Sequence, residues 1–146
     1  MTPSFCLDTN IPVLLIRGKD LGQRIDQEFG LSQAPFRHTI SIVSHGELFA
    51  LADRNRWGED KVAVLEKTLR EFVTVDVAGQ KIVEAYREVE RFNAGAAAGA
   101  VQMGKNDIWI AATAMVTDQP LITTDKDFDH LHGKLLRVFW VDPTVR

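Results

Sequence analysis

Several short apolar runs in this sequence stop at a polar residue and then give way to a helical pattern. Residues 5–7 end at Asp8, residues 38–43 lead into a helical stretch, and residues 121–124 end at Asp125. Short β-branched runs predict strands, whereas apolar residues repeated every three or four positions predict helices. Alternating strands and helices indicate an α/β fold, with a mainly parallel central sheet covered by helices on both faces in three α/β/α layers.

The same patterns give the approximate position of each element. We expect helices over residues 11–16, 20–29, 47–52, 59–70, 79–92 and 105–116, strands over residues 5–8, 38–43, 72–75, 121–124 and 136–141, a connector over 33–36 and a mobile alanine-rich loop over 93–100. The helix over residues 105–116 is apolar on all sides, which predicts that it is buried.

Length and composition limit the class of protein. A chain of 146 residues suits one domain, here residues 1–146, and the net charge of -3 provides no overall basic field for coating DNA. A nucleic-acid enzyme remains compatible with this charge, because metal-binding carboxylates would themselves make it negative. The lone Cys6 excludes an internal disulfide. The absence of a signal-like or membrane-spanning segment predicts a cytoplasmic protein.

Four acidic residues stand where strands and helices meet. Asp8 and Asp125 follow strands, while Glu47 and Asp107 lie near the beginnings of helices. Because the carboxyl ends of parallel strands meet at one edge of a sheet, we expect the four carboxylates to converge there. Converging carboxylates repel one another unless a cation lies between them, and oxygen ligands suit Mg²⁺ or Mn²⁺. Such a site predicts metal-assisted phosphodiester hydrolysis.

Each acidic residue also has a purely structural explanation. Asp8 or Asn10 could cap the following helix, and Ser44-x-x-Glu47 has the form of a capping box. Asp107 could interact with a helix dipole, and Asp125 could begin a turn. Independent caps have no reason to gather at one edge of a sheet, so the set as a whole favours a functional site.

These residues form a series of motifs that resembles a known family. Asp8-Thr9-Asn10, Ser44-x-x-Glu47-Leu48, Asn106-Asp107-x-x-Ile110 and Thr123-Thr124-Asp125-x-Asp127-Phe128 resemble the successive motifs of PIN domains, and their order and spacing are similar to those of the bacterial VapC toxins. The resemblance implies an Mg²⁺- or Mn²⁺-dependent endoribonuclease with a PIN-like α/β/α fold. It places Asp8, Glu47, Asp107 and Asp125 in the acidic set, with Asp127 as a fifth candidate, and Thr9, Asn10 and Thr124 beside them as residues that orient carboxylates or water.

The resemblance also implies partners. VapC-like proteins act on RNA, are paired with an inhibitory antitoxin and form homodimers, so apolar helix surface around residues 11–29 and 48–69 is expected to meet protein partners. Arg54, Arg56 and Lys105 lie in segments next to the expected site, where they could bind RNA phosphates. Trp57 could stack on a base, although burial explains it equally well.

Other interpretations stay open at this level. An acidic pocket also serves receiver-like phosphoacceptor modules, although those carry an acidic pair after the first strand where this chain has only Asp8. A PIN fold without catalytic activity could bind RNA or protein alone. The pair His130-x-His132 offers too few ligands for a transition-metal site and is expected to form a surface turn.

Overall fold

The central sheet is parallel throughout, as the sequence predicts. The computed structural model describes residues 4–35, 37–96 and 99–144. Its strands are β1 (Cys6–Leu7), β2 (Thr39–Ser41), β3 (Val73–Val75), β4 (Leu121–Thr123) and β5 (Val138–Trp140), in the spatial order β3-β2-β1-β4-β5. Every pair of neighbouring strands is parallel. The strand β1, whose two residues are fully buried, therefore lies at the centre of the sheet.

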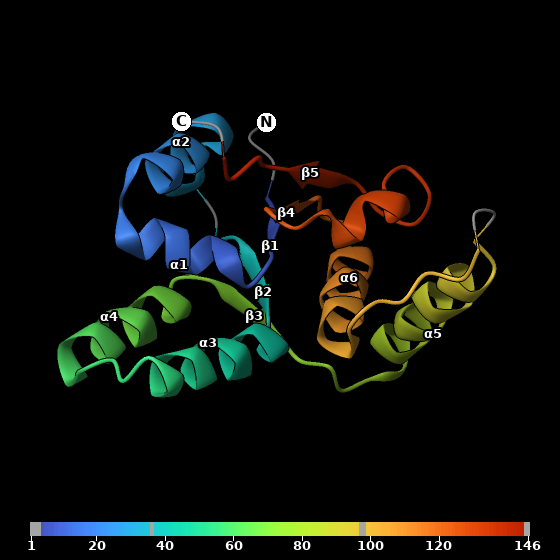
Figure 1. Cartoon of the computed structure of the whole chain (residues 1–146), viewed down its shortest axis with the longest axis horizontal. Helices are drawn as coiled ribbons and strands as arrows, with labels where there is room; N and C mark the ends of the chain where they lie inside the picture. The colour runs from blue at the N-terminus through green and yellow to red at the C-terminus, as the bar shows by residue number, and fades with distance from the viewer. Residues whose placement is uncertain (1–3, 36, 97–98, 145–146) are drawn as a thin grey trace.

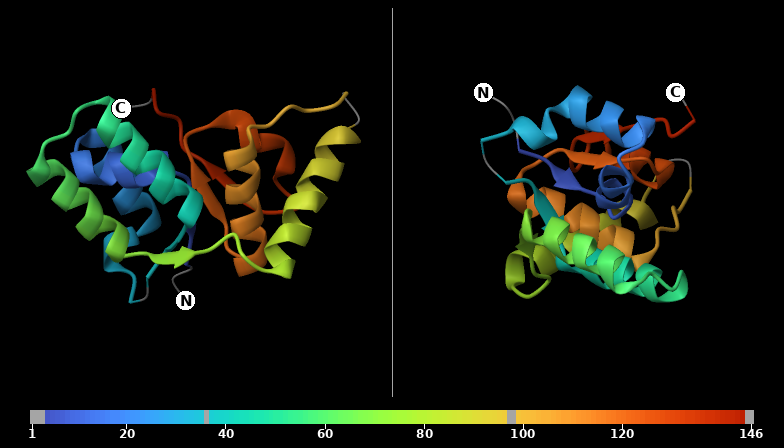
Figure 2. Two further views of the ribbon diagram at one scale, coloured as in Figure 1. Left: turned by 90° about the horizontal axis from the view of Figure 1, so that it is seen from below. Right: turned by 90° about the vertical axis from the view of Figure 1, so that its left-hand side faces the viewer.

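Helices cover both faces of this sheet and give the three-layer α/β/α architecture (Figure 1). They are α1 (Asn10–Arg17), α2 (Asp20–Phe29), α3 (Ile42–Arg54), α4 (Glu59–Arg70), α5 (Gln80–Ala94) and α6 (Lys105–Thr117), with two 3₁₀ helices, η1 (Leu31–Gln33) and η2 (Lys126–Leu131). Helices α1 to α4 gather on one side and α5, α6 and η2 on the other (Figure 2). None of the helices in the described parts of the chain is both long and apolar enough to cross a membrane.

The two faces of the sheet belong to two different apolar clusters. Leu7 and Ile122 pack with α1 to α4, whereas Cys6 and Leu121 pack with α5, α6 and η2. Adjacent strand residues point to opposite faces, so each short strand contributes to both clusters. The helix α6 lies against β1 and β2 and has six fully or nearly buried residues, which confirms the burial that its uniformly apolar sequence predicts.

The start of α3 differs from the sequence prediction. The strand predicted over residues 38–43 is shorter in the structure, because β2 ends at Ser41 and α3 begins at Ile42. Ser41 caps α3, and its hydroxyl accepts a hydrogen bond from the Val43 N–H at 3.1 Å. The capping box that the spacing of Ser44 and Glu47 would allow is therefore not formed. Ser44 lies inside the helix with its side chain buried.

The helix that follows Asp8 also begins without the predicted cap. Thr9 is the N-cap residue of α1, and no side chain caps that end. The Asp8 carboxylate is thus not explained by helix capping. The helix α5 extends to Ala94 and so includes the first two residues of the predicted 93–100 loop. Residue 36 of the predicted connector and residues 97–98 of the predicted loop lie outside the described residues.

Two helical glycines have opposite surroundings, which predicts opposite effects of the same substitution. A Cβ atom on Gly22 would lie 2.1 Å from the Leu14 carbonyl oxygen, whereas a Cβ atom on Gly46 would meet nothing within 4 Å. Gly22→Ala should lower the free energy of unfolding by about 1–3 kcal/mol, because α1 and α2 must move apart. Gly46→Ala should raise it by roughly 0.5–1 kcal/mol through helix propensity. Denaturant titration of both variants tests the pair, and equal effects would contradict the close packing of α1 on α2.

Candidate metal site at the carboxyl edge of the sheet

The strand order places a crevice between β1 and β4. The chain leaves β1 toward β2 on one side, while β4 and β5 lie on the other, so the order of the strands reverses between β1 and β4. Ligands of open α/β sheets bind at such a switch point, outside the carboxyl ends of the strands. Asp8 directly follows β1, and Asp125 comes two residues after the end of β4. Both residues therefore begin at the edge where a site is expected.

Three carboxylates converge beside this crevice. One oxygen from each of Asp107, Asp125 and Asp127 lies within 4.8 Å of the others. Asp107 comes from the first turn of α6, while Asp125 and Asp127 come from the turn into η2. The Asp127 N–H donates to the Asp125 carboxylate at 2.9 Å, which fixes that turn. The structure thus brings Asp107 of one predicted motif together with Asp125 and Asp127 of another.

Asp8 is the buried member of the acidic set, with only 5% of its surface exposed. The Thr123 hydroxyl donates to one carboxylate oxygen at 2.6 Å, and the Thr9 N–H donates to the other at 2.8 Å. Thr123 in turn accepts a hydrogen bond from the Asp125 N–H at 2.9 Å. One threonine hydroxyl therefore couples the position of Asp8 to that of Asp125.

Glu47 is held from the opposite side of β1. The Thr9 hydroxyl donates to Glu47 Oε1 at 2.6 Å and lies 2.8 Å from the hydroxyl of the buried Ser44. Because the single proton of Thr9 goes to the carboxylate, Ser44 must be the donor to Thr9. Ser44 therefore supports Glu47 through Thr9, which is a different role from the helix cap that its sequence position indicates.

The carboxylates affect one another's protonation. Burial, followed by the negative charges of Asp8, Asp125, Glu47 and Asp127, raises the pKa of Asp107 to about 7. Burial is also the main reason that the pKa of Asp8 rises to about 6, against the hydrogen bonds from Thr123 and Thr9, with smaller contributions from the charges of Asp125 and Glu47. Asp107 thus lies within electrostatic reach of all the other acidic candidates.

The chemistry of this donor set fits a hard divalent cation. Every convergent ligand atom is a carboxylate oxygen, the type preferred by Mg²⁺ and Mn²⁺. After burial, the neighbouring carboxylates also contribute to the raised pKa values of Asp8 and Asp107, so their negative charges repel one another. A divalent cation among these oxygens would remove that repulsion.

The remaining predicted residues occupy different places. The side chain of Asn10 is exposed, and the backbone oxygen of Thr124 accepts a hydrogen bond from the Trp140 indole at 3.0 Å. Sequence reasoning missed Thr123 and the hydrogen bond of Ser44 to Thr9. In the parallel register Cys6 lies beside Leu121 and Leu7 beside Ile122, so the next position places Asp8 beside Thr123. Only this register distinguishes Thr123 from Thr124.

Two other candidates have structural partners. The ring of Trp57 packs against the core cluster beneath α1 to α4, and Lys61 Nζ lies 4.1 Å from its centroid. His130 bonds to the Asn93 side chain at 2.7 Å, and His132 accepts from the Val138 N–H at 2.9 Å. The expected surface turn is in fact the end of the 3₁₀ helix η2, where His130 is half-buried and His132 is exposed.

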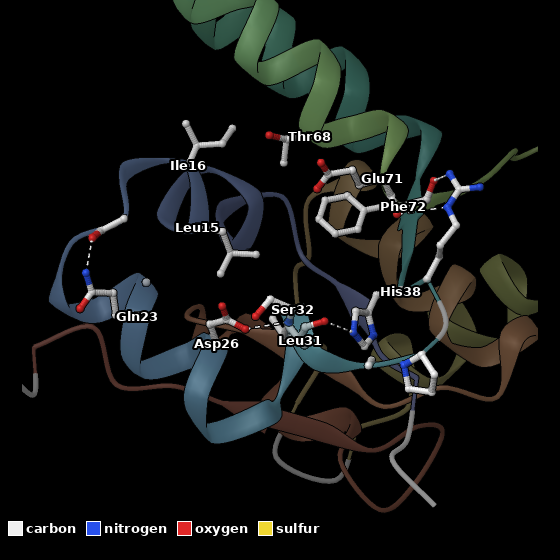
Figure 3. Close-up of a pocket in the computed structure, with 15 residues that line it drawn as sticks. Leu15, Ile16, Gln23, Asp26, Leu31, Ser32, His38, Thr68, Glu71 and Phe72 are labelled. Atoms are coloured by element: carbon white, nitrogen blue, oxygen red, sulfur yellow. Dashed lines mark hydrogen bonds between the residues drawn. The ribbon is translucent and has the colours of Figure 1, made fainter.

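A cleft of about 620 Å³ lies away from the metal site, between α1, α2, η1 and the end of α4 (Figure 3). Three of its polar side chains are bonded to its own walls: His38 donates to the Leu31 oxygen at 3.1 Å, Asp26 accepts from the Ser32 N–H at 2.8 Å, and Gln23 donates to the Gly18 oxygen at 2.8 Å. None of the carboxylates of the metal site lines it. Size alone therefore does not locate the chemistry.

Fold and site together define an α/β/α protein with a carboxylate cluster at the switch point of a parallel sheet. The chain belongs to the PIN domain family, whose model matches residues 5–134. No curated protein sequence matches it.

Solved structures with the same fold include several toxin–antitoxin complexes. VapBC2 from Rickettsia felis bound to promoter DNA has a TM-score of 0.74 at 22% identity, covering 94% of this chain and 98% of that one. DNA-bound VapBC from Salmonella typhimurium has a TM-score of 0.72 at 19% identity, covering 94% and 97%. VapBC-1 from nontypeable Haemophilus influenzae has a TM-score of 0.70 at 22% identity, covering 93% and 96%.

The raised pKa values predict how stability and metal binding depend on pH. Asp8 and Asp107, with pKa values of about 6 and about 7, keep protons in the folded protein that the unfolded chain has already released. Their contribution to stability is therefore complete at low pH and is lost as the pH rises through 6 to 7. Without metal, Asp107→Asn should raise Tm relative to the wild type at pH 8 more than at pH 5.

Stabilisation of the wild type by bound metal should have the opposite pH dependence. Bound cations require the ionised carboxylates, so Mn²⁺ should raise the wild-type Tm much more at pH 8 than at pH 5. Thermal unfolding with Mn²⁺ and with chelator, at both pH values, measures the effect. A Tm increase that is independent of pH would contradict binding at Asp8 and Asp107.

The hydroxyl of Thr9 should matter more than its shape. Thr9→Val removes the hydrogen bond to Glu47 while leaving the backbone N–H that bonds to Asp8. We expect Mn²⁺ affinity to fall by about 10- to 100-fold, as is usual when a residue that orients a ligand is lost. Thr9→Ser should restore most of the affinity. Calorimetric titration of both variants compares them directly, and an unchanged affinity in Thr9→Val would exclude Glu47 from the metal site.

Proposed function

We propose that this protein is an Mg²⁺- or Mn²⁺-dependent endoribonuclease that hydrolyses RNA phosphodiester bonds and acts as the toxin of a VapC-type toxin–antitoxin pair. The observation that carries the proposal is the convergence of Asp107, Asp125 and Asp127 at the switch point, where one carboxylate oxygen of each lies within 4.8 Å of the others. Structural acidic residues have no need to accumulate unneutralised charge at one place. A site for phosphodiester hydrolysis needs it to hold the metal.

The proposed roles follow from the hydrogen bonds. Asp8, Glu47, Asp107 and Asp125 hold the metal and form the catalytic set, and Asp127 completes the convergent trio with Asp107 and Asp125. When bound, the cation polarises the phosphate and lowers the pKa of the attacking water. Thr9 orients Glu47 through its hydroxyl and Asp8 through its N–H. Asn10 and Thr124 flank the set and are proposed to support it.

RNA as the substrate is supported by basic residues around an otherwise acidic site. Arg54, Arg56 and Lys105 have exposed side chains, and Lys105 opens the helix that carries Asp107. Cations beside a carboxylate site allow a polyanion to approach, because they bind the phosphates that flank the cleaved one. We propose that these three residues contribute phosphate contacts.

The protein partners are proposed from the structural neighbours and the shape of the surface. Several neighbours are toxin–antitoxin complexes, so we propose a cognate antitoxin and a homodimer for this chain. The cleft in Figure 3 is lined by Leu15, Ile16 and Phe72 and borders the apolar helices expected to meet partners. We propose that the antitoxin covers it.

Substitution of single carboxylates tests the nuclease assignment. Asp107→Asn and Asp8→Asn each remove one ligand with little change of shape, so cleavage of a structured RNA in Mg²⁺ or Mn²⁺ should fall by at least about 100-fold, a loss of about 2.7 kcal/mol of transition-state stabilisation. Asp60→Asn is the matched control, because Asp60 is exposed on α4 outside the acidic cluster. Gel analysis of labelled RNA, with and without chelator, gives the rates.

Growth after induced expression supplies a second readout. The wild type and Asp60→Asn should arrest growth, and the two site variants should not. Undiminished cleavage by both site variants would show that the metal site is wrong. A wild type that binds RNA without cutting it in either metal would instead identify a PIN fold that only binds. The receiver-like alternative is set aside because the chain belongs to the PIN family.

A further inference from the structure

Asn93 is a buried polar residue that lies outside the motifs of the acidic set. Only 3% of its surface is exposed, and it belongs to the last turn of α5. The oxygen of its side-chain amide lies 2.7 Å from His130 Nε2. Because an amide oxygen can only accept a hydrogen bond, the His130 N–H is the donor. This bond joins the end of α5 to the 3₁₀ helix η2.

The helix η2 holds two of the three converging carboxylates. Asp125 caps its beginning, and Asp127 lies in its first turn. The Asp125 N–H bonds to the Thr123 hydroxyl, so the beginning of η2 has a directional contact with the sheet. Apolar burial, which anchors the middle of η2, does not specify a direction, whereas a hydrogen bond does. The bond from His130 to Asn93 therefore fixes the other end of η2.

The main chain of Asn93 contacts the segment that leads to the third carboxylate. Its carbonyl oxygen accepts a hydrogen bond from the Val101 N–H at 2.9 Å, shortly before α6 begins. Asp107 lies in the first turn of α6. The helix α5 also packs along α6, where the rings of Tyr86 and Trp109 lie 4.3 Å apart. One residue thus contacts both segments that supply the converging carboxylates.

Stability does not explain why this pair is polar. The side-chain nitrogen of Asn93 is buried and has no hydrogen-bond partner among the residues that the structure describes. A buried donor without an acceptor lowers stability, and an apolar side chain of similar shape would avoid that cost. The His130 ring stacks on Phe92, with centroids 6.3 Å apart, and a phenyl ring would keep this contact.

We propose that Asn93 and His130 are positioning residues of the candidate metal site. Their hydrogen bond holds η2 against α5, which packs on α6, and so keeps Asp125 and Asp127 at the distance from Asp107 that a shared cation requires. The proposal rests on the proposed metal-dependent function and adds two residues that act through the segments they join. Loss of a residue that orients metal ligands usually weakens metal binding by about 10- to 100-fold.

Four variants separate the hydrogen bond from the packing around it. The double variant Asn93→Leu with His130→Phe replaces the pair by apolar side chains of similar shape. His130→Phe alone removes the same hydrogen bond and serves if the double variant folds poorly. His130→Gln keeps a nitrogen donor for Asn93. Ala85→Gly is the matched control for stability, because Ala85 is buried on the same helix about two turns before Asn93.

We expect the double variant to bind Mn²⁺ about 10-fold more weakly than the wild type in calorimetric titration. Its Tm without metal should be unchanged or higher, because the buried donor without a partner is gone. His130→Gln should retain most of the affinity. Ala85→Gly should lower Tm through its lower helix propensity and leave the affinity for Mn²⁺ unchanged.

Hydrogen exchange without metal measures the effect on η2 directly. The His132 N–H bonds to the Asp129 oxygen at the end of η2, and the Asp127 N–H bonds to the Asp125 carboxylate at its beginning. Both should exchange faster in the double variant and in His130→Phe than in the wild type. The Leu121 N–H, which bonds to the Arg137 oxygen in the sheet, is the internal reference and should not change.

Each contrary result has its own meaning. Unchanged Mn²⁺ affinity in the double variant and in His130→Phe would overturn the proposal. An equal loss of affinity in Ala85→Gly would also overturn it, because the effect would then follow from lower stability. A wild type that binds no Mn²⁺ would contradict the proposed metal-dependent function. Exchange of the Asp127 N–H would then decide on the positioning role, and an unchanged rate in the variants would exclude it.

Discussion

The buried carboxylate of Asp8 is the constraint on which the rest of the site depends. It lies at the centre of the sheet, where burial opposes ionisation and only two hydrogen bonds favour it. Both donors are fixed by the strands: the Thr9 N–H follows β1, and Thr123 is the last residue of β4. A shift of one residue in the pairing of β1 with β4 would turn Thr123 away and leave one oxygen of the buried carboxylate without a donor, which is more costly than the loss of an ordinary surface contact.

The hydrogen bonds spread outward from Asp8 and fix the other carboxylates. One path runs through Thr9 to Glu47, with Ser44 behind it in α3, and the other runs through Thr123 to the backbone of Asp125 and on to Asp127. Asp107 is positioned differently, by the burial of α6 against β1 and β2. Separate chain segments therefore deliver their charges to one place through hydrogen bonds and packing among the protein's own residues. Such preorganisation is what a metal site of defined geometry requires.

Sequence patterns predicted the sheet and the helix α6, because both depend on local periodicity, and they predicted that Asp107 and Asp125 would come together at one edge of the sheet. They failed where the answer depends on register or on competition between neighbouring residues. Ser41 and Ser44 are both plausible caps in the sequence, and the hydrogen bond from the Val43 N–H decides for Ser41. Thr123 and Thr124 are equivalent until the pairing of β1 with β4 is known. Arg54 and Arg56 are likewise equivalent in the sequence, and they differ in the structure because α3 ends at Arg54 and Arg56 lies in the turn that follows.

The small residues of α3 have a further consequence for the balance between stability and function. Gly46 lies inside a helix, where glycine is less favourable than alanine by roughly 0.5–1 kcal/mol. Its Cβ position is open, so packing does not require glycine there, unlike at Gly22, where a Cβ would collide with α1. A residue that lowers helix stability without a packing reason is best explained by the surface it leaves free. That surface is part of a groove between Glu47 and Arg54, which begins at the acidic set.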